Sequence, residues 1–303
     1  MRLSILGAGF IGLNFIRSPS SKEFDITVLD SNPCPIDLIG KVNWIQGDFF
    51  SQDKLLAAIK NSETIFHFIS TTVPGDEVDE ASELGSNVGQ TLALLKLCLK
   101  EKVKRVVFIS SASVYGIQFS APISELAPTN PISSHGISKL TIEKYLEFYK
   151  YNYGLDCKIL RLSNPYGPGQ NVKGRQGFIA IAIGKIMSGE KLIVRGDGSI
   201  VRDYIYIEDV SSALRELSLT TSDISLFNIG SGIGYSLNEV LQKLSALMGK
   251  SILVDYGANR FVDIPSSILD VSRAGRVLKY KTHYTFDQGL LLTLEHHKIK
   301  VTV

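Results

Sequence analysis

Three glycines near the N-terminus constrain the fold of this chain more than any other feature. The apolar run at residues 2–6 ends in Gly7-Ala8-Gly9-Phe10-Ile11-Gly12, and an apolar helical pattern follows to about Ile16. This is a G-x-G-x-x-G motif between a strand and a helix, where glycines let the backbone approach a pyrophosphate. The pyrophosphate charge then lies against the helix N-terminus. The pattern predicts a dinucleotide site formed by Gly7, Gly9, Phe10, Ile11 and Gly12.

A carboxylate stands where such a unit would meet the ribose of the dinucleotide. The second predicted strand, Asp25–Leu29, is followed directly by Asp30. A carboxylate here accepts hydrogen bonds from the ribose 2′- and 3′-hydroxyls and repels a 2′-phosphate. The sequence therefore predicts NAD rather than NADP. The alternative interpretation of Asp30 is a turn residue, since Ser31-Asn32-Pro33 follows it.

Strands and helices alternate along the first half of the chain. Residues 42–45 and 65–69 have strand character, and helical patterns lie near 52–60 and 86–100. Such alternation predicts an α/β fold with a doubly wound parallel sheet, which binds ligands at the carboxyl ends of its strands. His67 lies inside an apolar strand and is interpreted as a core histidine. The residues expected to contact the cofactor at this edge are Asp48, Phe68 and Ser70.

The pattern changes after the predicted strand at residues 156–162. Proline and glycine dominate the next loop, and shorter strands and helices follow without a low-complexity linker. We therefore predict a second, smaller domain that is interleaved with the first. The predicted dinucleotide-binding domain is 1–166 with a return near 203–229, and the predicted substrate-binding domain is 167–202 with 230–303.

Hydroxyl and basic side chains are expected to meet at one end of the sheet. Ser110-Ser111-Ala112-Ser113 follows the buried run 106–109, and a predicted helix over 135–151 carries His135 and Lys139. Residues four apart share one helix face. A hydroxyl at a strand end facing a basic pair is suited to proton transfer. The predicted catalytic residues are Ser111, Ser113, His135 and Lys139.

The composition is that of an ordinary globular chain. Of 303 residues, 44% are hydrophobic and 20% charged, and the formal net charge is +2. This balance gives no indication of a nucleic-acid or membrane partner. The widely spaced Cys34, Cys98 and Cys157 are typical of reduced thiols in the cytoplasm. No residue pattern suitable for a metal site accompanies them.

Two helical segments carry broader apolar stripes than one buried face requires. The segment 86–101 has leucines at four-residue spacing, and the segment 135–152 contains Ile142, Tyr145 and Leu146. Broad apolar faces on adjacent helices are typical of a symmetric interface. We predict a homodimer through this helix pair, with burial in the chain's own core as the alternative.

In the order of its motifs the chain resembles the extended short-chain dehydrogenase/reductase family. The resemblance is strongest to NAD-dependent nucleotide-sugar epimerases and dehydratases of the UDP-galactose 4-epimerase type, and it covers nearly the whole length. It implies a Rossmann fold, NAD and a nucleotide-sugar substrate. Leu6 and Gln90 stand where the family has glycines. The matching segments are Gly7–Gly12, Asp30, Asp48, Asn87-Val88, Arg161–Gly169 and Arg202-Asp203-Tyr204.

The resemblance also implies roles for individual residues. Ser111 would hydrogen-bond the reacting sugar hydroxyl with support from Ser113, and Lys139 would hold the nicotinamide ribose. Arginines are suitable partners for the substrate diphosphate. The implied substrate is a UDP-hexose or UDP-N-acetylhexosamine, and the small Ser267 leaves room for an N-acetyl group. The residues matched to substrate binding are Asn164, Arg202, Arg260, Asp263 and Ser267.

The catalytic base departs from the family pattern of tyrosine, three residues and lysine. Here the pair is His135 and Lys139. Imidazole is a competent base near neutral pH but is shorter than a phenol. Three accounts stay open: His135 is the base, directly or through a water; another group does the chemistry; or the protein binds its ligands without turnover. Ala112-Ser113 replaces the Asp-Glu of the dehydratases, which argues against dehydration.

The predicted function is an epimerase that works through a transient keto-sugar and hydride transfer to bound NAD, in surface-polysaccharide or sugar-nucleotide metabolism. Two alternatives remain open. One is a nucleotide-sugar reductase or dehydrogenase. The other is a protein that binds NAD and nucleotide sugar without turnover.

Overall fold

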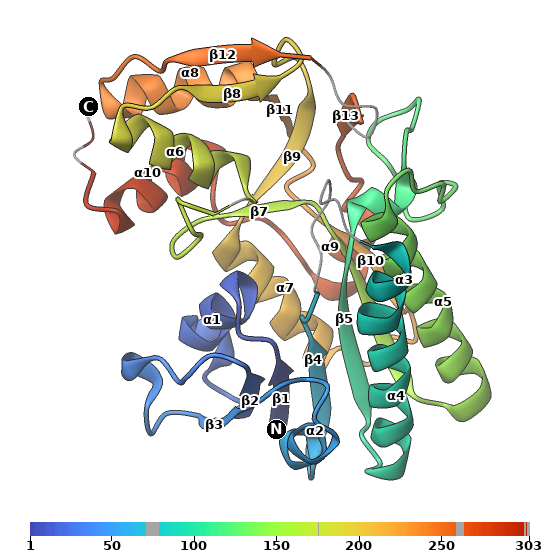
Figure 1. Cartoon of the computed structure of the whole chain (residues 1–303). Coiled ribbons are helices and arrows are strands. Elements are labelled where there is room, and N and C mark those ends of the chain that lie inside the picture. Colours follow the sequence, from blue (N-terminus) through green and yellow to red (C-terminus); the bar gives the residue numbers. More distant parts are fainter. Residues whose placement is uncertain (71–78, 175, 259–263, 300, 302–303) are drawn as a thin grey trace.

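A seven-stranded parallel sheet forms the centre of the molecule in the computed structural model, which describes all residues except 71–78, 175, 259–263, 300 and 302–303. Its strand order is β10-β6-β5-β4-β1-β2-β3 (Figure 1). The strands are β1 (Arg2–Leu6), β2 (Asp25–Asp30), β3 (Asn43–Gln46), β4 (Thr64–His67), β5 (Arg105–Ser111), β6 (Asp156–Leu162) and β10 (Leu226–Ile229). The predicted doubly wound α/β fold is confirmed.

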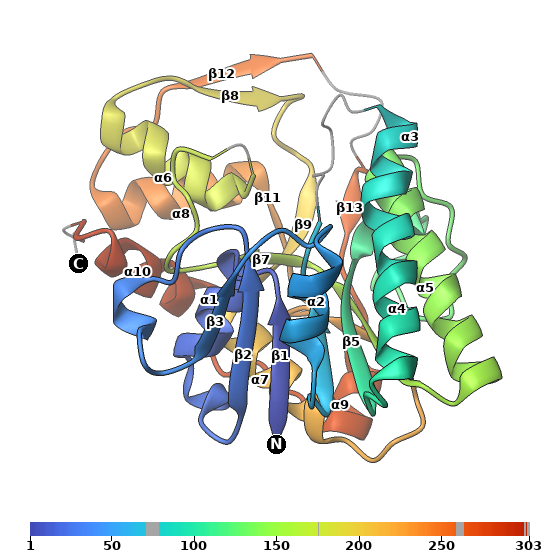
Figure 2. The same ribbon diagram turned by 60° about the horizontal axis from the view of Figure 1, so that its bottom comes forward.

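Helices cover both faces of this sheet because its strands are apolar on both sides. In β1, Leu3 and Ile5 pack into the core that also contains α1 and α7, whereas Leu6 packs into the core with α2, α4 and α5. Figure 2 shows α4 and α5 side by side on their face of the sheet. The bounds are α1 (Phe10–Arg17), α2 (Gln52–Ile59), α4 (Gln90–Lys100), α5 (Ser134–Tyr153), α7 (Ile207–Leu219) and α9 (Ser272–Leu278).

A smaller group of elements lies above the carboxyl ends of the large sheet (Figure 1). One short sheet contains β7 (Asn164–Tyr166), β9 (Val201–Tyr206), β11 (Gly234–Ser236) and β13 (Ser266–Ser267), and β8 (Leu192–Arg195) pairs with β12 (Val254–Gly257). Helices α6 (Phe178–Ser188), α8 (Leu237–Met248) and α10 (Phe286–His296) pack around them. The remaining short helices are η1 (Pro19–Ser21), η2 (Ile36–Leu38), α3 (Glu80–Glu83), η3 (Leu84–Gly89) and η4 (Ala112–Tyr115).

Within the described part of the chain, no helix is long and apolar enough to cross a bilayer.

The helix predicted at 86–100 is not α-helical at its start. Its first residues belong to η3, a π-helix that leads into α4. Single π-helical turns inside longer helices occur frequently at functional sites. This turn holds Asn87, whose side chain is buried.

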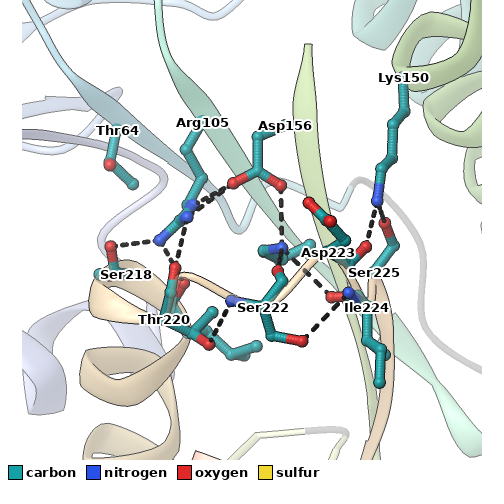
Figure 3. A network of polar contacts seen from close by, with 12 residues as sticks. Thr64, Arg105, Lys150, Asp156, Ser218, Thr220, Ser222, Asp223, Ile224 and Ser225 are labelled. Atoms are coloured by element: carbon teal, nitrogen blue, oxygen red, sulfur yellow. Dashed lines mark hydrogen bonds and ion pairs between the residues drawn. The ribbon is translucent and has the colours of Figure 1, made fainter. Parts of the chain in front are cut away.

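A polar network joins the amino-terminal ends of β5 and β6 to the loop after α7 (Figure 3). Arg105 donates hydrogen bonds to the carbonyl oxygens of residues 217, 218 and 220, which close the last turn of α7. Asp156 lies 2.6 Å from Arg105 and 2.9 Å from the buried Lys158. Lys158 in turn donates to Ser222 O at 2.5 Å. Arg105 thus satisfies carbonyls that the end of α7 leaves without partners, and Lys158 satisfies one in the loop that follows.

Replacing Arg105 by alanine is expected to lower the free energy of unfolding by about 2–3 kcal/mol, because partly buried carbonyls and Asp156 lose a charged partner. Urea denaturation measures the change. Lys144→Ala is the control, since the Lys144–Glu147 ion pair is exposed at 3.0 Å and such pairs contribute roughly 0–1 kcal/mol. Equal losses in the two variants would contradict a stabilising role for the network.

Candidate active site

A cavity of about 740 Å³ lies between the carboxyl ends of the large sheet and the smaller elements above it. This size is typical of a site for a small-molecule ligand. It is lined from below by the turn after β1 and the ends of β4, β5 and β6, and from above by α6, β8 and β9. The predicted site residues that line it are Gly9, Phe10, Ile11, Phe68, Ser70, Ser111, His135, Lys139, Asn164 and Arg202.

The glycine turn has the close packing that the motif requires. A Cβ atom at Gly12 would lie 2.6 Å from the carbonyl oxygen of Gly7, so only glycine fits there. A Cβ atom at Gly9 would meet nothing within 4 Å, which leaves the turn open toward the cavity. The amino end of α1 therefore presents backbone N–H groups to a ligand, as a pyrophosphate site needs.

Four predicted cofactor residues do not line the cavity, namely Gly7 and Gly12 in the glycine turn and the two carboxylates Asp30 and Asp48. Asp30 ends β2, and its carboxylate accepts hydrogen bonds from Ala8 N at 2.7 Å and Asn32 N at 2.8 Å. It therefore ties the end of β2 to the glycine turn. Asp48 follows β3 and accepts from Phe50 N at 3.0 Å. Contacts of these two carboxylates with ribose and adenine stay a prediction.

Lys139 lines the cavity but is almost completely buried. Its Nζ donates to Ile109 O at 2.9 Å and lies 4.7 Å from the centre of the Phe108 ring. Burial lowers the pKa of Lys139 to about 8, and the negative charge of Glu143 opposes that shift. The side chain is thus a fixed cation near neutral pH, one helical turn after His135 on α5.

Of the two predicted catalytic serines, only Ser111 lines the cavity. Ser111 ends β5 and lines the cavity, and its Oγ accepts from Ser113 N at 3.1 Å. Ser113 does not line the cavity, and its buried Oγ has no hydrogen-bond partner among the described residues. The first turn of α5 lies against it, since a Cβ atom at Gly136 would be 2.9 Å from Ser113 O. Direct support of a substrate by Ser113 stays a prediction.

Of the predicted substrate residues that the structure describes, Asn164 and Arg202 line the cavity and Ser267 does not. Asn164 Nδ2 donates to Asp203 O at 3.1 Å, and Arg202 Nη1 donates to Ile264 O at 2.6 Å. Ser267 is buried on β13 beside Arg202 but does not line the cavity. Arg260 and Asp263 lie outside the described residues.

The sequence matches the NAD dependent epimerase/dehydratase family over residues 4–230. The chain belongs to this family. Membership confirms the resemblance to NAD-dependent nucleotide-sugar epimerases and dehydratases. It also confirms that the protein is an enzyme and that its cofactor is NAD. The glycine turn, Phe68, Ser70 and Lys139 all face the cavity and fit this cofactor.

Three similar proteins extend this finding. The chain is 30% identical to the UDP-glucose 4-epimerase of Mycolicibacterium smegmatis over 99% of each chain. The UDP-glucose 4-epimerase of Thermotoga maritima, solved with UDP-glucose, aligns at 29% identity and a TM-score of 0.92 over 98% of this chain and 99% of that chain. The UDP-N-acetylglucosamine 4-epimerase of Methanobrevibacter ruminantium, solved with UDP-N-acetylmuramic acid, aligns at 25% identity and a TM-score of 0.89 over 98% of both chains.

Sequence reasoning missed a buried ion pair beneath the epimerase-family site. Glu143 on α5 is fully buried and accepts from Arg161 Nη2 at 2.6 Å and from the hydroxyl of Ser110. The Arg161 guanidinium also lies 4.6 Å from the centre of the Tyr115 ring. This network joins α5 to the ends of β5 and β6. Residues 135, 139 and 143 share one helix face, so the spacing was a readable signal, but the partner strand was not.

A second buried carboxylate, also missed, stands beside His135. Glu83 is 2% exposed and accepts a hydrogen bond from the hydroxyl of Ser134. Glu83, Asn87, His135 and Lys139 line one narrow crevice next to the cavity. His67 lies in the core as expected, with Nε2 2.8 Å from Thr91 Oγ1, and burial lowers its pKa to about 3. The crevice therefore places a buried acid, Glu83, beside His135, whereas His67 lines neither the crevice nor the cavity.

Proposed function

We propose that this protein is an NAD-dependent nucleotide-sugar epimerase whose substrate is a UDP-hexose or a UDP-N-acetylhexosamine. The observation that carries the proposal is that one cavity is lined by the glycine turn, by Ser111, His135 and Lys139, and by Arg202. Such a cavity offers a dinucleotide site, a proton-transfer group and a cation for a diphosphate. The named activities of the similar proteins support the same reaction class.

In the proposed reaction, the Ser111 hydroxyl orients the reacting hydroxyl of the sugar. A ring nitrogen of His135 takes the proton of that hydroxyl and later returns it, directly or through one water. When bound, NAD supplies the acceptor for the hydride and the source for its return. The ammonium group of Lys139 holds the ribose hydroxyls and stabilises negative charge near the base. Arg202 pairs with the substrate diphosphate.

The hexose of the substrate is the finer part of the proposal. Ser267 is buried beside Arg202 without lining the cavity, and a small residue at this position is proposed to leave room for a C2 substituent. A structural relative at 25% identity is named as an epimerase of UDP-N-acetylglucosamine, which supports the larger substrate. A kinetic comparison in which UDP-N-acetylglucosamine is not preferred over UDP-glucose would contradict the proposed preference for an N-acetylhexosamine.

Incubating the purified protein with UDP-glucose and with UDP-N-acetylglucosamine tests the reaction. NMR spectra of the sugar report epimer formation, and absorbance reports any net NADH. We expect an epimer without net change in NADH. A stoichiometric redox change would contradict epimerisation in favour of a dehydrogenase or reductase. Binding of both sugars with no product would contradict turnover altogether.

Further parts of the proposal concern the whole molecule. We infer an interleaved substrate domain over 167–202 and 230–303, and a homodimer through the paired helices α4 and α5. The dimer is supported by exposed apolar residues on α5: Ile137, Tyr145, Phe148 and Tyr151. A cytoplasmic location is supported by Cys34, Cys98 and Cys157, which are all free thiols. A role in surface-polysaccharide or sugar-nucleotide metabolism completes the proposal and is supported by the proposed substrate class.

A further inference from the structure

Three residues of the cavity wall hold buried polar atoms that have no hydrogen-bond partner within the described chain. They are Ser163 Oγ, Gln170 Oε1 and Tyr204 OH. Such atoms are uncommon in folded proteins because burying a polar group without a hydrogen bond costs free energy. Where several such atoms line one cavity, they mark a place where a polar ligand can form hydrogen bonds. None of the three belongs to the site residues assigned above.

Their places in the fold put them between the reacting centre and Arg202. Tyr204 stands two residues after Arg202 on β9, so the two side chains share one face of the strand. Its register partner on β7 is Asn164, and Ser163 immediately precedes that strand. On the other side, Leu162 pairs with Ser111 in the large sheet. Gln170 lies beside β7, since its Nε2 donates to Pro165 O. A ligand that reaches from Ser111 to Arg202 therefore passes these three residues.

Hydrogen-bonding capacity decides which part of the ligand they meet. The Gln170 Nε2 already donates to Pro165 O at 3.4 Å, and its Oε1 can only accept. Phosphate oxygens at neutral pH offer an acceptor no proton, so a diphosphate does not satisfy Gln170. Sugar hydroxyls both donate and accept, and they suit Gln170, Tyr204 and Ser163 together.

We propose that Tyr204, Gln170 and Ser163 form a subsite that hydrogen-bonds hydroxyl groups of the substrate's hexose ring. The subsite rests on the proposed nucleotide-sugar function and deepens it. It also predicts an unusual combination of properties. Removing one of these polar atoms takes away an unsatisfied group from the free protein and a hydrogen bond from the complex. Stability and affinity therefore change in opposite directions.

The test compares two tyrosine-to-phenylalanine variants of the protein with NAD present. Tyr280→Phe is the matched control, because Tyr280 is buried away from the cavity and its OH donates to Gly230 O at 2.8 Å. Calorimetric titration measures binding of UDP-glucose and of UDP, which lacks the hexose, and thermal unfolding measures stability. For Tyr204→Phe we expect UDP-glucose to bind roughly three- to tenfold more weakly, UDP to bind unchanged, and Tm to stay or rise. For Tyr280→Phe we expect a lower Tm and unchanged affinities.

Gln170→Met is a second variant of similar volume, and we expect it to show the pattern of Tyr204→Phe. The proposal is overturned if both cavity variants bind UDP-glucose like the parent, if UDP and UDP-glucose weaken equally, or if Tm falls as in the control. A parent protein that binds neither UDP nor UDP-glucose would overturn the proposed function along with the subsite. A parent that epimerises UDP-glucose while the cavity variants bind it normally would overturn the subsite alone.

Discussion

His135→Ala is expected to slow epimerisation of a UDP-sugar by roughly 10²- to 10⁴-fold, the usual contribution of a general base. The reason is that His135 lines the cavity with Ser111, on the helix face that also carries Lys139. Steady-state kinetics on the purified protein measure the loss. Because the imidazole acts on the proton and not on the nucleotide, kcat should fall while the affinity for the UDP-sugar stays close to that of the parent.

His135→Gln is the matched control, since it keeps a polar side chain that is not a base near neutral pH. It should lose as much activity as His135→Ala. If His135→Gln turns over like the parent, the histidine is not the base and another group carries the proton.

The variant His135→Tyr tests whether the active site suits imidazole better than the phenol that is usual in the family. Because Glu83 is buried beside position 135, we expect a site built around imidazole and a slower tyrosine variant. A faster tyrosine variant would mean that histidine is a weakened substitute.

Glu143→Ala is expected to lower the free energy of unfolding by about 3–5 kcal/mol, the usual effect of leaving one charge of a buried pair without its partner. Arg161 lies 2.6 Å from Glu143, and both side chains are almost completely buried. Urea denaturation of the single variant and of Glu143→Leu with Arg161→Met measures the effect. The double variant should recover much of the loss, because it leaves no unpaired charge. A double variant that is less stable than Glu143→Ala would contradict this explanation.

Glu143→Gln separates the charge from the shape of this residue. The Glu143 carboxylate raises the pKa of Lys139 against burial, which lowers it to about 8. Loss of that negative charge lowers the pKa further, so the ammonium form is lost at lower pH. His67 faces Lys139 from β4 but is neutral there, because burial lowers its own pKa to about 3. The alkaline limb of the kcat/KM profile should therefore move to lower pH in Glu143→Gln, and an unmoved limb would contradict the coupling.

Much of the fold was predictable from local signals. The glycine turn, the alternating strands and helices and the pairing of His135 with Lys139 depend on spacing along the chain. Other features depend on contacts between distant segments. Strands β7, β11 and β13 have two or three residues each, too few for a periodic pattern. The roles of Glu83 and Glu143 depend on Ser134 and Arg161, which lie on other elements or far along the chain.

The same limit applies to the site. The sequence-based predictions named ten residues that line the cavity but also included Ser113 and Ser267, which do not line it. A motif preserves the residue type at a position, whereas a wall of a cavity depends on which side chains the packing turns inward. Ser163 and Tyr204 stand in matched segments and Gln170 just after one, but their unpartnered polar atoms could be recognised only from the cavity itself.

A crystal structure of the protein with NAD and a UDP-sugar tests the central claim most directly. The distance to be measured is from the His135 ring nitrogens to the sugar hydroxyl that also contacts Ser111 Oγ. We predict a separation of roughly 2.6–3.2 Å, directly or through a single bridging water. A ring nitrogen that reaches that hydroxyl neither directly nor through one water would contradict catalysis by His135.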